Sequence, residues 1–192
     1  MLAQIAQLLV DFVASFLVFL LLARFHFQWL RVPFRNPVGG FIVAMTDWMV
    51  RPARRVIPSV AGLDLATLIG AWLVQALALW LLLSIRDLET GGGSSASAAI
   101  GFIAVLALLD LARYSLYILI FAVLVQVVLS WLNPHSPVAP LFQALTQPFL
   151  APIRRVLPPI GNVDLSPLVL LLLLQVLLIP LGHLRMMVGA PG

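Results

Sequence analysis

The sequence has no cysteine, no lysine and few charged residues of any kind. Of its 192 residues, 9% are Asp, Glu, Lys or Arg, and all eleven basic residues are arginine. About a quarter of the residues are charged in an ordinary soluble domain. The low charge therefore argues against a soluble fold. The absence of cysteine excludes disulfides, thiolate metal sites and a cysteine nucleophile.

Recognisable catalytic and ligand-binding motifs are also missing. His26, His135 and His183 are scattered and do not have the spacing of metal ligands. There is no Ser-His-Asp set, and the three glycines at 91–93 are not followed by the lysine of a phosphate-binding loop. We therefore expect no enzyme activity, no cofactor and no metal. The net charge of +4 lies on arginines between apolar runs, which favours anionic lipid headgroups over nucleic acid as partners.

Long apolar runs dominate the chain. Hydrophobic residues make up 62% of it, and its mean hydropathy is +1.12. A helix of about 20 residues crosses a ~30 Å hydrocarbon core. The sequence thus predicts an all-α, polytopic membrane protein with four spans, at about 5–27, 64–85, 112–132 and 165–182. The run at 98–132 is too long for one bilayer. Either it tilts and projects as one helix, or its first part lies outside the membrane, with the break marked by Asp110 and Arg113, which are spaced to form an ion pair.

The chain contains an internal duplication with an offset of one hundred residues. Fourteen of the 39 columns from 37 to 75 are identical to the residue one hundred positions later. The matches include proline, arginine, threonine, aspartate and glutamine, which leucine runs do not align by chance. We expect two repeats, at 1–90 and 98–192, joined by a Gly/Ser linker at 91–97.

The duplication also predicts the topology. Because each repeat contains two spans, the second repeat enters the membrane from the same side as the first, which makes the repeats parallel. Most arginines lie in the loops between the two spans of each repeat. The positive-inside rule then places these loops in the cytoplasm and both termini outside.

Each loop contains a short apolar stretch that cannot span a bilayer. In the first, Phe41, Met45 and Trp48 share one helical face, and in the second Leu141, Phe142 and Leu145 share a similar face. We expect amphipathic helices at about 38–50 and 138–150, lying in the headgroup region. The alternative is a pair of re-entrant hairpins buried in protein.

The repeated segments resemble the YggT (YlmG) family of bacterial and plastid membrane proteins. The resemblance is carried by an Asn-Pro start, a Leu-Thr-x-Pro segment, a Pro-x-Arg-Arg-x-x-Pro core and an Asp-Leu-Ser-Pro opening of a span. The second repeat matches almost throughout, whereas the first has Asp47-Trp48 and Ala66-Thr67 at two of these steps. The motif residues to which we assign a structural role are Thr46, Pro52, Pro58, Asp64, Thr146, Pro152, Pro158, Asp164, Ser166 and Pro167.

The family resemblance implies a location in the bacterial inner membrane. It implies associations with cell-division gene neighbourhoods, osmotic-stress tolerance and, in plastids, thylakoid or cytochrome assembly, but no defined reaction.

The repeated arginines have three alternative roles. The pairs Arg54/Arg55 and Arg154/Arg155 contact lipid headgroups, pair with Asp64 and Asp164 further along the chain, or recruit a cytoplasmic partner. Arg51 is a further candidate for contact with lipid headgroups or a partner. Asp64 and Asp164 stand where helix caps are expected. Ser166, followed by Pro167, is a competing cap.

Five polar residues lie in or near the predicted spans. A carboxylate within the bilayer usually marks an ion or proton path, but Asp11 and Asp110 also fit the outer interface, where Asp110 pairs with Arg113. Gln75 and Gln175 occupy the same repeat position, and we expect them to form hydrogen bonds between helices.

We expect one of two functions. The first is a non-enzymatic scaffold or assembly factor in membrane organisation, with cytoplasmic or membrane protein partners; the family resemblance implies cell division or osmotic-stress tolerance as the process. The second is a small ion channel, which needs several copies of a four-span chain to form a pore.

Overall fold

The protein is all-helical throughout its described residues. The computed structural model describes residues 2–59, 62–90, 100–133, 135–157 and 164–189. The linker predicted at 91–97 lies outside this set. The helices are α1 (Leu2–Trp29), α2 (Pro37–Val56), α3 (Leu65–Thr90), α4 (Ile100–Leu132), α5 (Ala139–Val156) and α6 (Ser166–Gly189). Four of them, α1, α3, α4 and α6, are long and apolar enough to cross a membrane.

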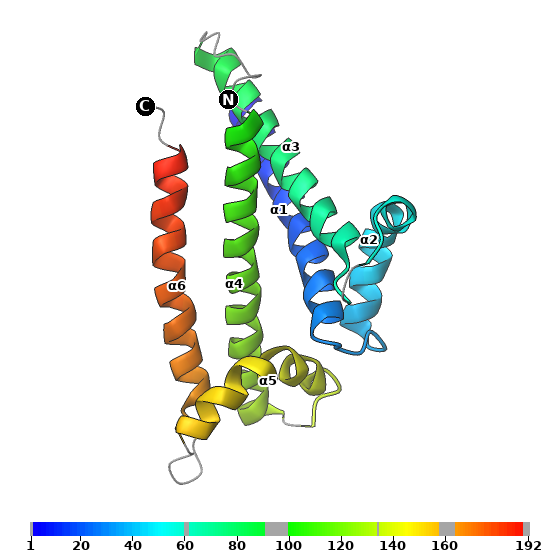
Figure 1. The fold of residues 1–192 in the computed structure, drawn as a ribbon, viewed down its shortest axis with the longest axis vertical. Helices are drawn as coiled ribbons and strands as arrows, with labels where there is room; N and C mark the ends of the chain where they lie inside the picture. Colours follow the sequence, from blue (N-terminus) through cyan, green and yellow to red (C-terminus); the bar gives the residue numbers. More distant parts are fainter. Residues whose placement is uncertain (1, 60–61, 91–99, 134, 158–163, 190–192) are drawn as a thin grey trace.

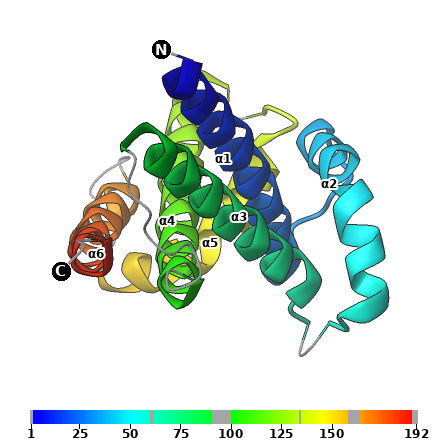
Figure 2. The ribbon, with the colours of Figure 1, turned by 90° about the horizontal axis from the view of Figure 1, so that it is seen from above.

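The long helices pack mainly in two pairs. α1 packs against α3, α4 packs against α6, and contacts between α3 and α4 join the two pairs. The start of α1 and the end of α6 lie at one end of the molecule and α5 lies across the other end (Figure 1). Seen from above, α6 and α2 lie on opposite sides of the bundle (Figure 2). α6 is the least covered of the long helices, with 11% of its apolar window buried.

Helix α4 is one continuous helix of 33 residues, from Ile100 to Leu132. The helix does not break at Asp110 or Arg113, which agrees with the alternative of a single long helix. Its length is about 50 Å at ~1.5 Å per residue. Asp110 does not interrupt the helix because its carboxylate finds partners on α3 and α6, which are described below.

The two short helices extend further than predicted, to Val56 and Val156. Asn36 caps α2 by accepting a hydrogen bond from the backbone N–H of Gly39, at 2.8 Å. Pro52 lies inside α2, and Pro148 and Pro152 lie inside α5. Proline removes one helical hydrogen bond and bends a helix instead of ending it when packing supports both sides. Figure 2 shows the resulting change of direction along α2.

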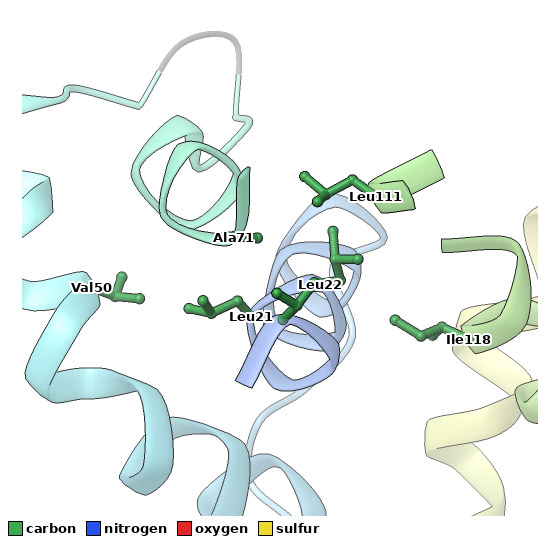
Figure 3. Packing of buried hydrophobic residues seen from close by; sticks show 7 residues of the cluster. Leu21, Leu22, Val50, Ala71, Leu111 and Ile118 are labelled. Carbon is green, nitrogen blue, oxygen red and sulfur yellow. The ribbon is translucent and has the colours of Figure 1, made fainter. Parts of the chain in front are cut away.

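The largest core cluster forms around the middle of α1. Val18, Leu21 and Leu22 of α1 are at most 1% exposed. They meet side chains from α2, α3 and α4, as Figure 3 shows: Val50, Ala71, Leu111 and Ile118. A second cluster joins the end of α1 to the short helices, and it contains Phe27, Ile42 and Leu145. The short helices are therefore packed onto the bundle by their inner faces.

Candidate functional site

The first arginine of each repeated pair forms an ion pair with an aspartate. In the first repeat, Arg54 at the end of α2 lies 2.6 Å from the carboxylate of Asp64, which precedes α3. The Thr67 hydroxyl donates to the same carboxylate. With its amide nitrogen facing Asp64, Gln28 of α1 donates to Asp64 at 2.8 Å and accepts from Arg54 at 2.5 Å. This cluster ties together the ends of α1 and α2 and the start of α3.

The second repeat has the same ion pair in a more exposed setting. Arg154 lies 2.8 Å from the carboxylate of Asp164, and both side chains are 35% exposed, whereas the Asp64 side chain is 8% exposed. Asp164 also accepts the backbone N–H of Ser166 at 2.9 Å. Arg154 donates to the amide oxygen of Gln147 at 3.1 Å. The pairing of arginine with the aspartate ten residues on is thus present in both repeats.

The two aspartates have lowered pKa values. Burial raises the pKa of Asp64, but the Arg54 guanidinium and the Thr67 hydroxyl outweigh burial and hold the pKa below its ordinary value. Burial likewise raises the pKa of Asp164, and the Ser166 N–H and Arg154 lower it below its ordinary value. Both carboxylates are therefore ionised at neutral pH, as the ion pairs require.

The second arginine of each pair points away from the protein. Arg55 and Arg155 are exposed. Within the described part of the chain neither forms an ion pair. Arg51, one turn earlier, is 77% exposed and pairs with Asp47 at 2.6 Å. The repeated arginines thus divide into one that is bound to the fold and one that is available to lipid phosphate or to a partner.

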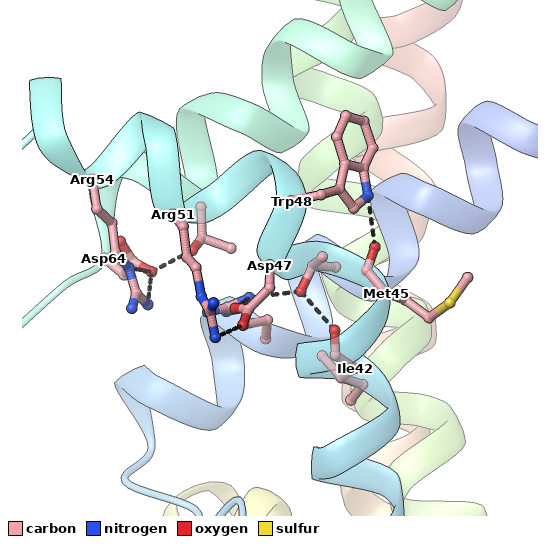
Figure 4. A network of polar contacts seen from close by, with 10 residues as sticks. Ile42, Met45, Asp47, Trp48, Arg51, Arg54 and Asp64 are labelled. Carbon is pink, nitrogen blue, oxygen red and sulfur yellow. Dashed lines mark hydrogen bonds and ion pairs between the residues drawn. The ribbon is translucent and has the colours of Figure 1, made fainter.

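A buried polar hub lies beside the ion pair of the first repeat, at Thr46 of α2. Arg24 of α1, only 4% exposed, donates to the Thr46 hydroxyl at 2.8 Å and lies 2.9 Å from Asp47. Thr46 in turn donates to the Ile42 carbonyl at 2.6 Å. Asp47 lies between Arg24 and Arg51, so a charged network joins α1 to α2, close to the Arg54–Asp64 pair (Figure 4).

The hub of the second repeat is neutral. Thr146 occupies the equivalent place on α5 and is fully buried. It donates to the side-chain oxygen of Gln126 on α4 and to the Phe142 carbonyl, the latter at 2.8 Å. An amide on α4 therefore replaces the guanidinium that α1 supplies in the first repeat.

The remaining motif residues support the helix ends. Pro52 and Pro152 are exposed on α2 and α5, and Pro58 lines a pocket of about 600 Å³ beside Arg54 and Asp64. Pro158 lies outside the described residues. The proposed cap at Ser166 is wrong: Ser166 and Pro167 are the first two residues of α6, and the Ser166 hydroxyl is buried without a hydrogen-bond partner. Asp164 accepts the backbone N–H of Ser166 at the start of α6 instead.

The outer faces of the two short helices differ. Phe41, Met45 and Trp48 of α2 are 50%, 41% and 68% exposed, so the predicted apolar face is open. The corresponding apolar face of α5 is buried instead, because Leu141 and Leu145 are each 2% exposed and pack against α1 and α4. The exposed side of α5 carries glutamine and proline. α2 thus has an apolar surface for a membrane and α5 has a polar one.

A second polar cluster lies between the long helices, at Asp110 of α4. Asp110 is 3% exposed. Arg185 of α6 donates to its carboxylate at 2.5 Å, and Gln75 of α3 donates at 3.0 Å. Arg113 lies 3.6 Å away, the pair that the three-residue spacing predicts. Three helices thus meet at one carboxylate, with two guanidinium groups to balance its charge.

Asp11 and Gln175 do not join this cluster directly. Asp11 is exposed and lines a groove of about 530 Å³ between α1 and α3, together with Gln4, Gln7 and Arg86. It lies close enough to Arg185 for an electrostatic attraction. Gln175 is exposed on α6, unlike its repeat counterpart Gln75, which is 5% exposed. Within the described residues, no group of three His, Asp or Glu side chains is placed to hold a metal ion.

Four residues that complete these clusters are not singled out by the sequence: Arg24, Gln126, Arg185 and Gln28. Arg24 ends an apolar run with aromatic neighbours, which is also the pattern of an interfacial arginine. The sequence does contain one indication that Arg24 has a partner. Asp47 is acidic at a motif position where the second repeat has Gln147, so the first repeat has a carboxylate that needs a cation. Arg185 and Asp110 are 75 residues apart and leave no local signal.

Comparisons with known proteins find one family and several relatives. The family model described as CCB3/YggT matches residues 3–85 and again residues 105–185. A Vibrio alginolyticus protein, described as an uncharacterised protein in the proC 3′ region, is 38% identical over 159 residues, covering 82% of this chain and 83% of the relative. An uncharacterised Pseudomonas aeruginosa protein is 33% identical over 180 residues, covering 92% and 88%. The uncharacterised protein YggT of Escherichia coli K12 is 32% identical over 158 residues, covering 82% and 78%. No solved structure matches the chain significantly.

Proposed function

The chain belongs to the CCB3/YggT family, and from this premise we propose that it is a non-enzymatic scaffold or assembly factor of the bacterial inner membrane. In this proposal the chain consists of two parallel repeats, its arginine motifs face the cytoplasm and both termini lie outside. Its role is in membrane organisation, with cell division or osmotic-stress tolerance as the processes that it serves.

The parallel arrangement is supported by three observations. The family model matches the chain twice, with about one hundred residues between the two starts. Each repeat has an Arg–Asp ion pair at the same motif position, Arg54 with Asp64 and Arg154 with Asp164. The start of α1 and the end of α6 both lie at the end opposite α5 (Figure 1). A cytoplasmic location for the arginine motifs agrees with the positive-inside rule.

The observation that carries the scaffold proposal is that the two arginines of each pair have different surroundings: the first is bound to an aspartate, and the second is exposed. Arg54 and Arg154 are held by aspartates, so they fix the angle between a short helix and the following long helix. Arg55 and Arg155 are exposed and lie outside the ion pairs. Each repeat therefore exposes one guanidinium, Arg55 or Arg155, at the end of a short helix held by an ion pair. Two such groups suit the recognition of anionic headgroups together with a partner protein.

The proposal is tested by affinity purification from native membranes in mild detergent. We expect a defined set of co-purifying proteins that is lost when Arg55 and Arg155 are both changed to alanine. The matched control is the double variant of Arg31 and Arg35, two arginines outside the repeated motif. If the Arg55→Ala/Arg155→Ala protein retains the same partners in the same amounts, the scaffold proposal is contradicted.

A second candidate function, an ion channel, is favoured by one observation. The groove of about 530 Å³ brings Asp11, Gln4, Gln7 and Arg86 together with four leucines on otherwise apolar helices. Within one copy, however, Asp110 is neutralised by Arg185, and the cluster around Leu21, Leu22 and Leu111 closes the space beside it. If the protein in liposomes conducts ions, and Asp11→Asn with Asp110→Asn abolishes the flux, the channel is favoured; the absence of flux excludes it.

A further inference from the structure

Gln175 is a polar residue near the middle of an exposed apolar helix. α6 is a candidate span from Ser166 to Val188, and Gln175 lies nine residues after its start. Nine residues of helix rise about 14 Å, roughly half of the hydrocarbon core. The further inference rests on the proposed placement of α6 across the membrane. In that placement, Gln175 lies far from the headgroups on either side.

The side chain of Gln175 points away from its own protein. Leu170 and Leu174 are 6% and 4% exposed and form the side of α6 that packs on α4. Gln175 is exposed, as are Leu168 and Ile179. An amide surrounded by hydrocarbon loses its hydrogen bonds to water and gains none, which is costly. The position therefore requires a hydrogen-bonding partner from outside the chain.

Gln75, the counterpart of Gln175 in the first repeat, has a hydrogen-bond partner within the chain. Gln75 is 5% exposed and donates to Asp110 at 3.0 Å, across the contact between α3 and α4. The first repeat satisfies its glutamine by packing α3 on the second repeat. Among the described residues no helix packs on the Gln175 side of α6, so the equivalent contact is left for another molecule.

The face that carries Gln175 is suited to a second copy of the same chain. Leu168, Gln175, Ile179 and Met186 lie on one side of α6 at spacings of seven, four and seven residues. This side carries no charge, so it selects no charged partner. At Gly182, on the same flank, an added Cβ would meet nothing within 4 Å, so another helix is able to approach closely.

The two-fold symmetry of a membrane dimer favours contact between identical residues. Two copies inserted in one membrane have the same orientation, so their α6 helices are parallel about a two-fold axis along the membrane normal. A residue near such an axis meets its own counterpart. An amide has both donors and an acceptor, so two glutamines satisfy one another. We propose that α6 is the self-association helix of this protein, with Gln175 hydrogen-bonded to the same residue of a second copy.

The absence of cysteine from the natural sequence makes a direct test simple. Single cysteines are introduced along α6 in the full chain, and disulfide formation is measured by oxidation in native membranes. We expect covalent dimers for Leu168→Cys, Gln175→Cys and Ile179→Cys. We expect none for Leu170→Cys and Leu174→Cys, the matched controls that face α4. Equal cross-linking at all five positions, no cross-linking, or cross-linking only to a different protein overturns the proposal.

A second measurement tests the role of the amide. In the cysteine-free protein we expect Gln175→Leu to raise the dimer dissociation constant about 3- to 30-fold, the range for one interhelical hydrogen bond, measured by energy transfer between labelled copies in liposomes. Gln175→Asn should retain most of the affinity. A Gln175→Leu protein that dimerises as tightly as the natural protein contradicts the proposed contact.

The membrane placement is controlled separately by labelling Gln175→Cys with a membrane-impermeant maleimide. If the cysteine is protected from the label but forms no dimer, only the self-association proposal fails. If it is labelled in intact membranes, α6 is not embedded, and the proposed topology fails together with the inference.

Discussion

The two repeats have the same motif residues, but the side chains that contact these residues differ between the repeats. In the first, a buried guanidinium and a carboxylate surround Thr46, and in the second a single amide contacts Thr146. The first ion pair, Arg54–Asp64, is supported by Thr67 and Gln28, whereas the second is half exposed. The comparison indicates that the motif specifies a geometry, in which a short helix is joined to a long one, and that the supporting side chains can be charged or neutral.

The short helices extend the comparison to the surface. α2 has apolar residues on both sides, with Ile42 and Val50 buried and Trp48 68% exposed. α5 buries Leu141 and Leu145 and leaves a polar outer side. The first repeat is therefore suited to contact with lipid at this end of the molecule, and the second to contact with water or with a protein. Matched variants in the two repeats test this asymmetry.

The largest effect is expected at the buried hub of the first repeat. Arg24→Leu removes the buried partner of Asp47 and of Thr46, and breaking a buried ion pair costs about 3 kcal/mol. The matched change in the second repeat, Gln126→Leu, removes a neutral hydrogen bond and should cost about 1 kcal/mol. Unfolding in detergent micelles measures both. Equal losses would show that the two hubs are energetically equivalent, contrary to this account.

The next effect concerns Gly39 near the start of α2, a position at which the two repeats differ by one methyl group. A Cβ at Gly39 would lie 2.6 Å from the Phe34 carbonyl oxygen, whereas the second repeat has Ala139 at this position. We expect Gly39→Ala to destabilise the protein by about 1–3 kcal/mol. Gly40→Ala is the control, because an added Cβ there meets nothing within 4 Å. It should be neutral or stabilise the helix by up to about 1 kcal/mol.

The ion pairs should contribute less, since their arginines are partly exposed. We expect Arg54→Ala to cost about 1 kcal/mol, because Asp64 is left 8% exposed with fewer partners. Arg154→Ala should cost about 0.5 kcal/mol or less, as Asp164 is 35% exposed. The neighbouring variants Arg55→Ala and Arg155→Ala should leave the unfolding midpoint unchanged. A larger loss for Arg55→Ala than for Arg54→Ala would reverse the roles assigned here.

The smallest effect is the pH dependence of stability. The pKa values of Asp64 and Asp164 are lowered in the folded protein, so folding favours their ionised forms. Their contribution is fully present above the unfolded value, 3.8, and is lost as the pH falls through the lower folded pKa. Unfolding measured from neutral pH to about pH 3 should show a shallower loss in Asp64→Asn than in the natural protein. An unchanged profile contradicts this linkage.

Much of the fold could be predicted from the sequence, because span length and the hundred-residue register are properties of the chain itself. The spacing of Arg54 from Asp64 also offered the ion pair as an alternative. The side chains that face inward could not be predicted in the same way. Arg24 has the local pattern of an interfacial residue but is 4% exposed, and Arg185 meets Asp110 only through the packing of α6 on α4. Gln75 and Gln175 share a register position, yet only the first is enclosed by a neighbouring repeat.

We propose above that both arginine motifs lie on one face of the membrane, as parallel repeats require, and that this face is cytoplasmic, as the positive-inside rule indicates. Single cysteines replacing Arg55 and Arg155, the exposed member of each pair, test it when intact cells are treated with a membrane-impermeant maleimide. We predict that neither cysteine is labelled in intact cells and that both are labelled after the inner membrane is opened. Labelling of one position but not the other in intact cells would contradict the parallel arrangement, and labelling of both would contradict the cytoplasmic orientation.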